Sequence, residues 1–82
     1  MSRQVWKQIL HPGWQEVPGR IVFFDPQGDD LCVWFEHRHV NVPLLVNVYG
    51  TGHDIPEGAS YLASCQQPPF VWHLYTIDKR FL

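Results

Sequence analysis

Short apolar segments separated by turn-forming residues are the feature of this sequence that most constrains its fold. Residues 20–24 and 31–36 are rich in β-branched and aromatic side chains, and Pro, Gly and Asp cluster between such segments. Helical periodicity is weak throughout, whereas this punctuation is typical of strands joined by turns. The sequence therefore predicts an all-β protein.

The pattern predicts six strands. We place them at residues 4–10, 20–24, 31–36, 44–49, 59–65 and 70–77. The acidic residues Asp25, Asp29 and Asp30 fit a solvated hairpin tip between the second and third strands. At 82 residues the chain has room for one core, so we expect a single β domain over residues 1–82.

The two halves of the chain resemble each other when one is shifted by 38 positions. The shift brings together three pairs of blocks: Glu16-Val17-Pro18 with Asp54-Ile55-Pro56, Phe23-Phe24 with Tyr61-Leu62, and Val33-Trp34 with Val71-Trp72. We therefore predict two pseudo-duplicated three-strand units, about residues 3–39 and 41–77, packed about a pseudo-twofold axis. They would form a small six-stranded barrel or sandwich with Trp34 and Trp72 as twin core anchors.

Charge and hydropathy narrow the partners. The net charge is −2, and the local basic cluster is only His37, Arg38 and His39, so duplex nucleic acid is not expected as a partner. No apolar stretch is long enough for a membrane span or a signal peptide, which predicts a cytoplasmic protein without membrane contact. Cys32 and Cys65 lack zinc or redox spacing and are expected to be free buried thiols.

The aromatic content predicts an interface. A domain this short buries only about 60% of the surface of its unfolded chain, so its many aromatic residues are hard to hide in one protomer. In the last predicted strand Phe70, Trp72 and Leu74 face one side, and Val71, His73 and Tyr75 face the other. We therefore expect a homo-oligomer or a binding surface there.

The best candidate site is the segment Gly50-Thr51-Gly52-His53-Asp54. Two glycines let a backbone turn its N–H groups toward a ligand, and Thr51 and His53 add donors. A plain glycine-rich bend remains the alternative, and the Lys-Ser/Thr ending of a nucleotide-hydrolase phosphate loop is missing. Trp14, His73 and Tyr75 complete the predicted binding residues, with Trp14 or Tyr49 as an aromatic wall.

Metal binding and catalysis are not expected. His37 and His39 would share one strand face, but no spacing fixes a third ligand. A nucleophile and base could in principle come from a small set, but nothing in their spacing requires it. That set is Ser60, Ser64, Cys65, His73 and Asp78. We therefore predict no metal, no cofactor and no catalytic residues.

A resemblance extends these expectations. The residues that carry it are Gly50-Thr51-Gly52-His53, Ile55-Pro56-Glu57-Gly58, Tyr61 and Pro69-Phe70-Val71-Trp72-His73. In these blocks the sequence resembles small phage-encoded proteins of unknown function that share a Gly-Thr-Gly-His, Ile-Pro and Phe-Val-Trp-His pattern. The match is close over the last third of the chain and loose over residues 17–36.

The resemblance implies a phage or prophage origin and a cytoplasmic role in the infected bacterial host. Small accessory phage proteins typically act by binding a host component. The implied function is therefore non-enzymatic binding, with counter-defence as one form: inhibiting a host protein, or sequestering a nucleotide-like signal in a pocket at an oligomer interface. The alternative is a minor structural or assembly protein of the phage particle.

Overall fold

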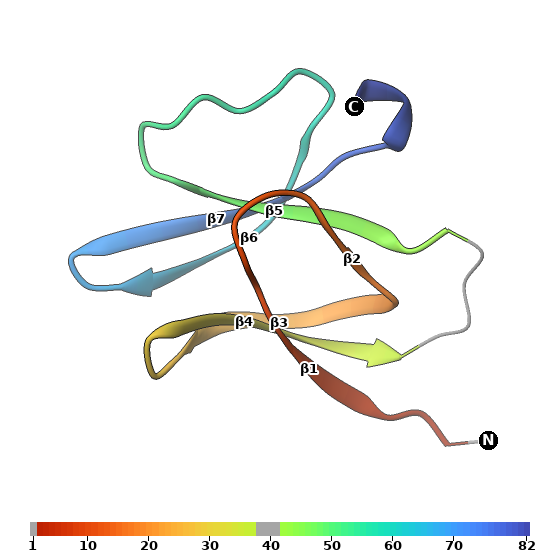
Figure 1. Cartoon of the computed structure of the whole chain (residues 1–82). Coiled ribbons are helices and arrows are strands. Elements are labelled where there is room, and N and C mark those ends of the chain that lie inside the picture. The colour runs from red at the N-terminus through yellow and green to blue at the C-terminus, as the bar shows by residue number, and fades with distance from the viewer. Residues whose placement is uncertain (1, 38–41) are drawn as a thin grey trace.

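The computed structural model describes residues 2–37 and 42–82, and the regular structure in them is β-strand apart from one short 3-10 helix. The strands are β1 (Val5–Ile9), β2 (Gln15–Val17), β3 (Gly19–Gln27), β4 (Asp30–His37), β5 (Leu44–Gly50), β6 (Ser60–Gln67) and β7 (Phe70–Thr76); the helix is η1 (Lys79–Phe81). They form two layers (Figure 1): one sheet in the order β1-β4-β3 and one in the order β2-β5-β7-β6. Among the described residues no strand pairing joins the layers, so two packed sheets replace the barrel alternative.

Strand β2 is the element that the sequence analysis missed. It has only three residues, too few to show alternation against the Pro and Gly around it. Its partners come from the other half of the chain, because Gln15 pairs with Val46 and Val17 pairs with Leu44. Val17 is fully buried, so β2 links the first half of the chain to the sheet of the second half.

The hairpin between β3 and β4 is tighter than predicted. Gln27 pairs with Asp30, which leaves Gly28 and Asp29 as a two-residue loop. Gly28 has φ +62°, a left-handed conformation that glycine adopts without steric cost. Pro26 takes part in the strand because β3 is an edge strand of its sheet, where a missing N–H is tolerated.

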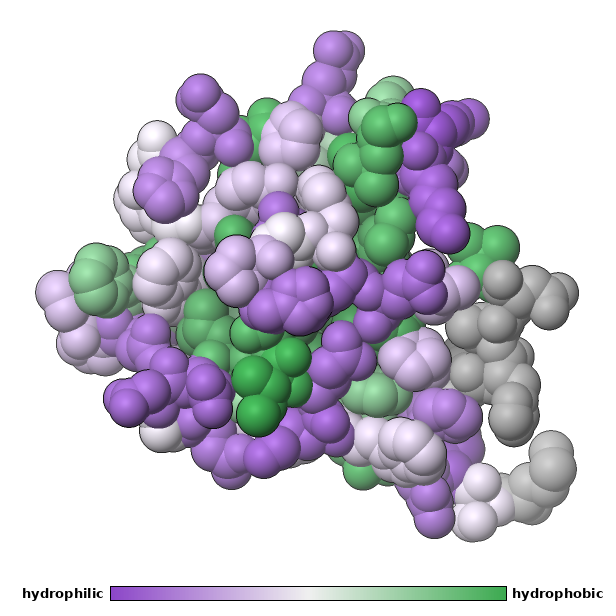
Figure 2. All heavy atoms as spheres, in the orientation of Figure 1, coloured by the Kyte–Doolittle hydropathy of each residue, from purple (hydrophilic) through white to green (hydrophobic). Residues whose placement is uncertain are grey.

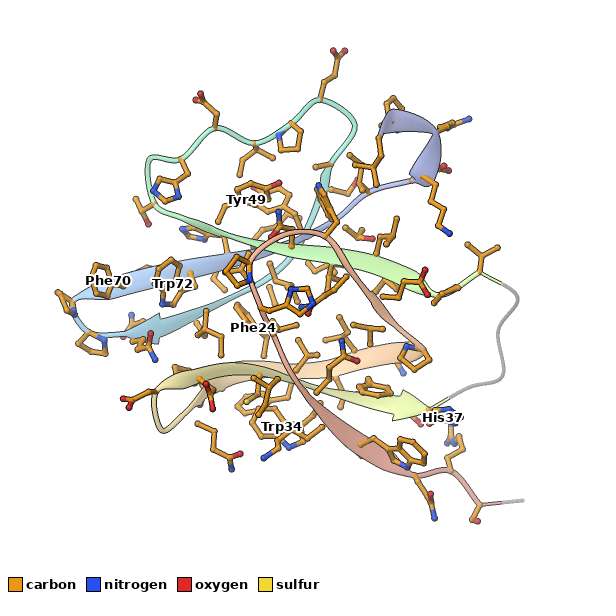
Figure 3. All side chains as sticks on the ribbon, viewed as in Figure 1. Phe24, Trp34, His37, Tyr49, Phe70 and Trp72 are labelled. Carbon is orange, nitrogen blue, oxygen red and sulfur yellow. The ribbon has the colours of Figure 1, made fainter. Side chains whose placement is uncertain are left out.

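The core lies between the two sheets. Its buried members are Val17, Phe24, Val33, Phe35, Val46, Cys65 and Leu74. Trp72 packs against this cluster, but Trp34 lies on the opposite side of its sheet, beside Phe23 at 5.4 Å between ring centroids (Figure 3). The prediction of Trp34 and Trp72 as twin core anchors is therefore wrong for Trp34.

Strand pairing repeats closely between the two halves. At the open ends of the two hairpins, Arg20 pairs with Glu36 and Ser60 pairs with Thr76. Next to the two hairpin loops, Gln27 pairs with Asp30 and Gln67 pairs with Phe70. The two hairpins therefore correspond at an offset of 40 residues. Each hairpin has a bulge at the same place, after Ile21 and after Tyr61. Strands β1 and β5 correspond at an offset of 41, since Val5 pairs with Glu36 as Val46 pairs with Thr76.

This register corrects the predicted offset of 38 and changes the residue matches. Trp34 corresponds to Leu74, and Trp72 corresponds to Cys32. Each half is a unit of two parallel outer strands, a crossover segment between them and a central strand. The first unit is β1, residues 10–18, β3 and β4; the second is β5, residues 51–59, β6 and β7.

The two units bury opposite faces. The first crossover runs from the three-stranded sheet to the edge of the four-stranded sheet and places Val17 in the core, whereas the second arches over the outer side of the four-stranded sheet (Figure 1). We call the face under a unit's own crossover its crossover face and the opposite face its flat face. The crossover face of the first unit holds Ile21, Phe24, Leu31, Val33 and Phe35; their counterparts Tyr61, Ser64, Val71, His73 and Tyr75 lie on the crossover face of the second unit.

The core forms where the crossover face of the first unit meets the flat face of the second. That flat face contributes Val46, Val48, Ala63, Cys65, Trp72 and Leu74. A twofold axis between the sheets would place equivalent faces against each other, so the predicted pseudo-twofold packing is wrong. The units instead stack front to back, because connections of the same hand place each crossover on the same side of its own unit.

Candidate functional site

The crossover face of the second unit carries side chains with polar groups where the buried crossover face of the first unit carries purely apolar ones. Tyr61 stands where the first unit has Ile21, His73 where it has Val33, and Tyr75 where it has Phe35. Tyr61 is 56% exposed and His73 is partly exposed. This surface combines aromatic area with hydrogen-bonding groups, the composition of protein binding surfaces.

Aromatic rings form a continuous row across this face. Trp14 meets Tyr49 edge-on at 6.2 Å between ring centroids, Tyr49 meets Tyr75 at 5.9 Å, and Tyr75 meets Tyr61 at 5.7 Å. These edge-to-face contacts are the favourable geometry for aromatic pairs. The row, which we call the tyrosine row, spans β5, β7 and β6 and brings the predicted residues Trp14 and Tyr75 onto one surface.

A chain of hydrogen bonds runs beside the tyrosine row. The Thr51 hydroxyl lies 3.0 Å from Nε2 of His73, and the Ser64 hydroxyl lies 2.8 Å from Nδ1 of the same ring. The Tyr61 hydroxyl lies 2.8 Å from Ser64 Oγ. Because a hydroxyl can donate or accept, either neutral tautomer of His73 is satisfied. These hydroxyl groups hold the imidazole ring of His73 in place, and no carboxylate takes part.

The turn at residues 50–53 is closed by its own histidine. The His53 N–H donates to the Gly50 carbonyl oxygen at 3.1 Å, and the Gly50 N–H donates to Nδ1 of His53 at 3.3 Å. Nδ1 therefore accepts, which leaves the proton of the neutral ring on Nε2. Gly52 has φ +90°, and a Cβ on Gly50 would press against His53 and Trp72. Glycine is therefore favoured at position 52 by its backbone conformation, whereas a side chain at position 50 would require the His53 and Trp72 rings to shift.

A cavity of about 470 Å³ lies between this turn and the β6–β7 hairpin. Its walls are Gly50, Thr51, His53, Pro69, Phe70, Val71 and Trp72. Phe70 is 56% exposed and inclined against Trp72 at 5.5 Å between ring centroids, at the end of the sheet where both are labelled in Figure 3. Among these described lining residues none is Lys, Arg, Asp or Glu. We call this cavity the 50–72 pocket.

The predicted site residues fall into two adjoining groups. Gly50, Thr51 and His53 line the 50–72 pocket, and Gly52 completes its turn. His73 joins the pocket to the tyrosine row through Thr51. Asp54 is exposed and does not line the pocket.

The aromatic walls of the pocket were not predicted. They are Phe70 and Trp72, in place of Trp14 or Tyr49. The contributions of Tyr61 and Ser64 to the outer face were also missed. The alternation along β6 could have located Tyr61 and Ser64 only if the bulge after Tyr61 had been known.

The residues weighed for catalysis do not converge. Ser64 and His73 meet, but Cys65 points into the core, and Asp78 caps η1 by accepting from the Arg80 N–H at 3.1 Å. Burial, together with the carboxylate of Asp25, raises the pKa of the Cys65 thiol from its ordinary 9.0 to about 11. The neutral thiol is a poor nucleophile. Both cysteines are buried and free, as predicted.

The histidines weighed for metal binding have other surroundings. His37 stacks on Trp6 at 4.5 Å between ring centroids, while Arg38 and His39 lie outside the described residues. Over residues 2–37 and 42–82, no group of three or more His, Cys, Asp or Glu is placed to hold a metal ion. In the same ranges, no helix has the length and hydropathy needed to cross a membrane.

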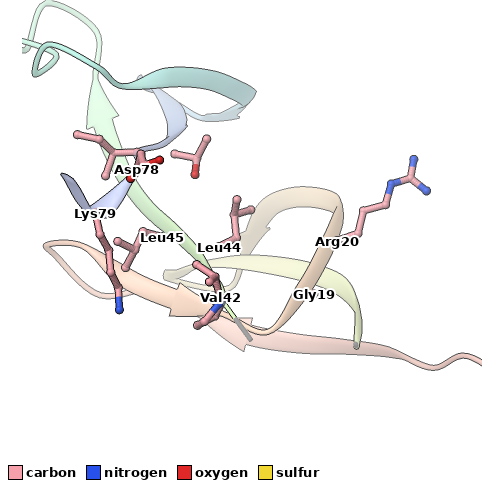
Figure 4. A pocket seen from close by; sticks show the side chains of 10 residues that line it. Gly19, Arg20, Val42, Leu44, Leu45, Asp78 and Lys79 are labelled. Carbon is pink, nitrogen blue, oxygen red and sulfur yellow. The ribbon is translucent and has the colours of Figure 1, made fainter. Parts of the chain in front are cut away.

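A second cavity, of about 370 Å³, is lined by residues from the starts of β3 and β5 and from the end of β7 and the segment after it (Figure 4). Leu44, Leu45 and Ile77 give it apolar walls, and Arg20, Asp78 and Lys79 also line it. None of the predicted site residues lies there. Figure 2 shows hydrophilic side chains interspersed with small apolar groups on the face turned to the viewer, so no apolar band dominates that face.

Fold and surface together define a small two-sheet β protein with an aromatic, hydroxyl-bearing outer face and an adjoining uncharged pocket. The chain belongs to a family described as a domain of unknown function, DUF7352, whose family model matches residues 1–80. No curated protein and no solved structure matches the chain.

Proposed function

We propose that this is a non-enzymatic binding protein that captures a small ligand bearing a planar ring in the 50–72 pocket. The observation that carries the proposal is the pocket itself, which joins the glycine turn at residues 50–53 to the aromatic walls Phe70 and Trp72. Its volume of about 470 Å³ is in the range of small-molecule sites. A largely exposed phenylalanine beside a tryptophan is suited to stacking with a flat ring.

The polar groups of the pocket favour a ring with a hydrogen-bond acceptor. Nε2 of neutral His53 carries a proton, because Nδ1 accepts the Gly50 N–H. Without a fixed charge among the described lining residues, the pocket is better suited to a base-like ring than to a phosphate. A nucleotide-like molecule fits this chemistry through its base.

The resemblance supplies the biological setting of the proposal. A phage or prophage protein in the cytoplasm of an infected bacterium could use such a pocket for counter-defence, holding a nucleotide-like signal away from the host. The duplication of a three-strand unit would then have produced the scaffold, and the second unit would have gained the site. This setting depends on the sequence pattern at residues 50–73.

Catalysis is not part of the proposal, although Ser64 and His73 are hydrogen bonded. The other nitrogen of His73 is held by Thr51, so no carboxylate stabilises a charged ring.

Calorimetric titration tests the proposal, using nucleosides, linear nucleotides and cyclic nucleotides as the panel. We expect at least one to bind, and Phe70→Ala to weaken binding at least about tenfold through loss of stacking. Phe81→Ala is the matched control, since Phe81 is 50% exposed and does not line the pocket. Absence of binding across the panel, or equal affinity in Phe70→Ala, would exclude the pocket as this kind of ligand site.

Inhibition of a host protein is a second candidate, favoured by the tyrosine row. Tyrosine gives large contact areas at low cost in conformational entropy, and Tyr61 is 56% exposed at one end of the row. Co-purification from host extract followed by Tyr61→Ala and Tyr75→Ala variants would test it. A small-ligand panel without effect, combined with a partner lost in both variants, would favour this candidate.

A minor structural or assembly role in the phage particle is a third candidate. The exposed apolar residues of edge strand β1, Val5 and Ile9, favour contact with other subunits. Mass spectrometry of purified particles decides this point, because absence of the chain from the particle removes the candidate.

A further inference from the structure

The packing of the two units inside the chain is a template for packing between chains. The core joins the crossover face of the first unit to the flat face of the second. The units share one strand-pairing pattern and stack front to back. Each unit therefore has one face in the core and one face that no other unit covers. The two uncovered faces are the crossover face of the second unit and the flat face of the first. They are again one crossover face and one flat face, the same combination that forms the core inside the chain.

The flat face of the first unit exposes several large apolar side chains to solvent. Val5, Ile9 and Phe23 are 57%, 54% and 54% exposed, and Trp34 lies beside Phe23. At the equivalent positions of the second unit, Val48 stands for the neighbouring Lys7 and Leu74 stands for Trp34. Val48 and Leu74 are both part of the core packing. This surface repeats a core-forming face with polar residues added, as expected of a reversible interface.

A pair of related cavities gives independent support. A cavity of about 330 Å³ is lined from the first unit by Leu10, Asp30 and Leu31, which correspond to Thr51, Phe70 and Val71 of the 50–72 pocket. The smaller cavity also has a wall from the second unit, made of Asn47, Val48, Gln67 and Trp72. The described residues that line the 50–72 pocket include no wall of this kind.

Part of this wall has counterparts on the first unit. Counterparts of Asn47, Val48 and Gln67 at the offsets of 41 and 40 are Trp6, Lys7 and Gln27. Lys7 donates a hydrogen bond from Nζ to Oε1 of Gln27, so the two side chains already lie together across the flat face. A second copy placed by the internal template would bring this pair to the open side of the 50–72 pocket.

We infer that the protein associates head to tail, the flat face of the first unit in one copy covering the crossover face of the second unit in the next. Ile55 is 37% exposed on the second crossover, whereas Val17 on the first crossover is fully buried in the core. Asp54 and Glu57 on that crossover add negative charge opposite Lys7. The contact is heterologous, so it continues into a ring or a short filament.

Self-association does not depend on a ligand. Only the statement that Lys7 of a second copy walls the 50–72 pocket rests on the proposed function. The two can fail separately: a protein that associates but binds no member of the nucleotide panel excludes the ligand, and a strictly monomeric protein that binds ligand excludes the association.

Two single variants and their mixture test the inference by sedimentation velocity over a range of concentrations. Phe23→Glu places a charge on the flat face, and Tyr61→Glu places one on the crossover face; both positions are more than half exposed, so folding should survive. The wild-type protein should show a mass that rises with concentration. Each variant alone should weaken association about thirtyfold or more, as for loss of an interface hot spot.

The mixture separates a head-to-tail contact from a twofold dimer. Tyr61→Glu retains an intact flat face and Phe23→Glu retains an intact crossover face, so together they should form one dimer that cannot grow further. Circular dichroism of each variant confirms that the fold is retained. A monomeric wild-type protein, a mixture that stays monomeric, or association that only one of the two variants affects would overturn the inference.

Discussion

The two three-strand units share strand order, register and bulge position, yet one hides the face that the other exposes. In the first unit the crossover face is packed with Ile21, Val33 and Phe35; in the second the same positions hold Tyr61, His73 and Tyr75. The backbone therefore does not decide which face is buried. The difference teaches that position in the stack sets burial, and that side chains have diverged to suit it.

The largest expected effect comes from substituting alanine at one matched pair. Phe24 is 4% exposed and its counterpart Ser64 is on the outer face. Phe24→Ala should lower the free energy of unfolding by about 3–5 kcal/mol through loss of burial and creation of a cavity. Ser64→Ala should cost about 1 kcal/mol or less. Urea denaturation measures both, and similar costs would contradict the assignment of opposite faces.

A matched pair at the start of the two hairpins tests a steric difference. A Cβ on Gly19 would overlap the carbonyl oxygen of Glu36, whereas the residue at the corresponding position of the second hairpin, Ala59, already carries a Cβ. Gly19→Ala should destabilise by about 1–3 kcal/mol, because backbone atoms must move. Ala59→Gly, the control, should cost under about 1 kcal/mol. A neutral Gly19→Ala would show that the β3–β4 pairing can open there without cost.

The contribution of Cys65 to the free energy of unfolding depends on pH, and Asp25, its counterpart in the first unit, is part of the cause. Burial chiefly, and Asp25 in addition, raise the pKa of the Cys65 thiol from 9.0 to about 11, so the folded state holds this proton more tightly than the unfolded state. The resulting stabilisation is fully present below pH 9 and is lost as pH rises toward 11. Between those limits wild-type protein should lose more stability than Cys65→Ala. Asp25→Asn should reduce the difference only partly.

The smallest effect concerns the hydrogen-bonded chain, which has no counterpart in the first unit. Thr51, at the position of Leu10, holds Nε2 of His73. Thr51→Val should cost under about 1 kcal/mol, because both groups are accessible to water, while changing the ring ¹⁵N chemical shifts of His73. Thr51→Ser keeps the hydroxyl and should leave those shifts close to wild type. Unchanged shifts in Thr51→Val would mean that the bond does not persist in solution.

Much of the fold was predictable because its signals are local. Turn residues and β-branched runs located six of the seven strands, and the repeat was recognised before its register was known. The glycine turn was found in the same way, from Gly50 and Gly52. Phe70 was not recognised as a pocket wall, because its meeting with the turn depends on the pairing of β5 with β7.

The sequence by itself determined that the chain is all-β, that it contains two similar units, and that its cysteines are buried thiols. These depend on composition and on neighbours along the chain. Only the tertiary structure decided the offset of 40, the place of β2 and the choice of buried face. An even shift of 38 or 40 preserves the alternation of side chains, so alternation alone cannot separate the two, and the bulges that fix the register arise from contacts between strands.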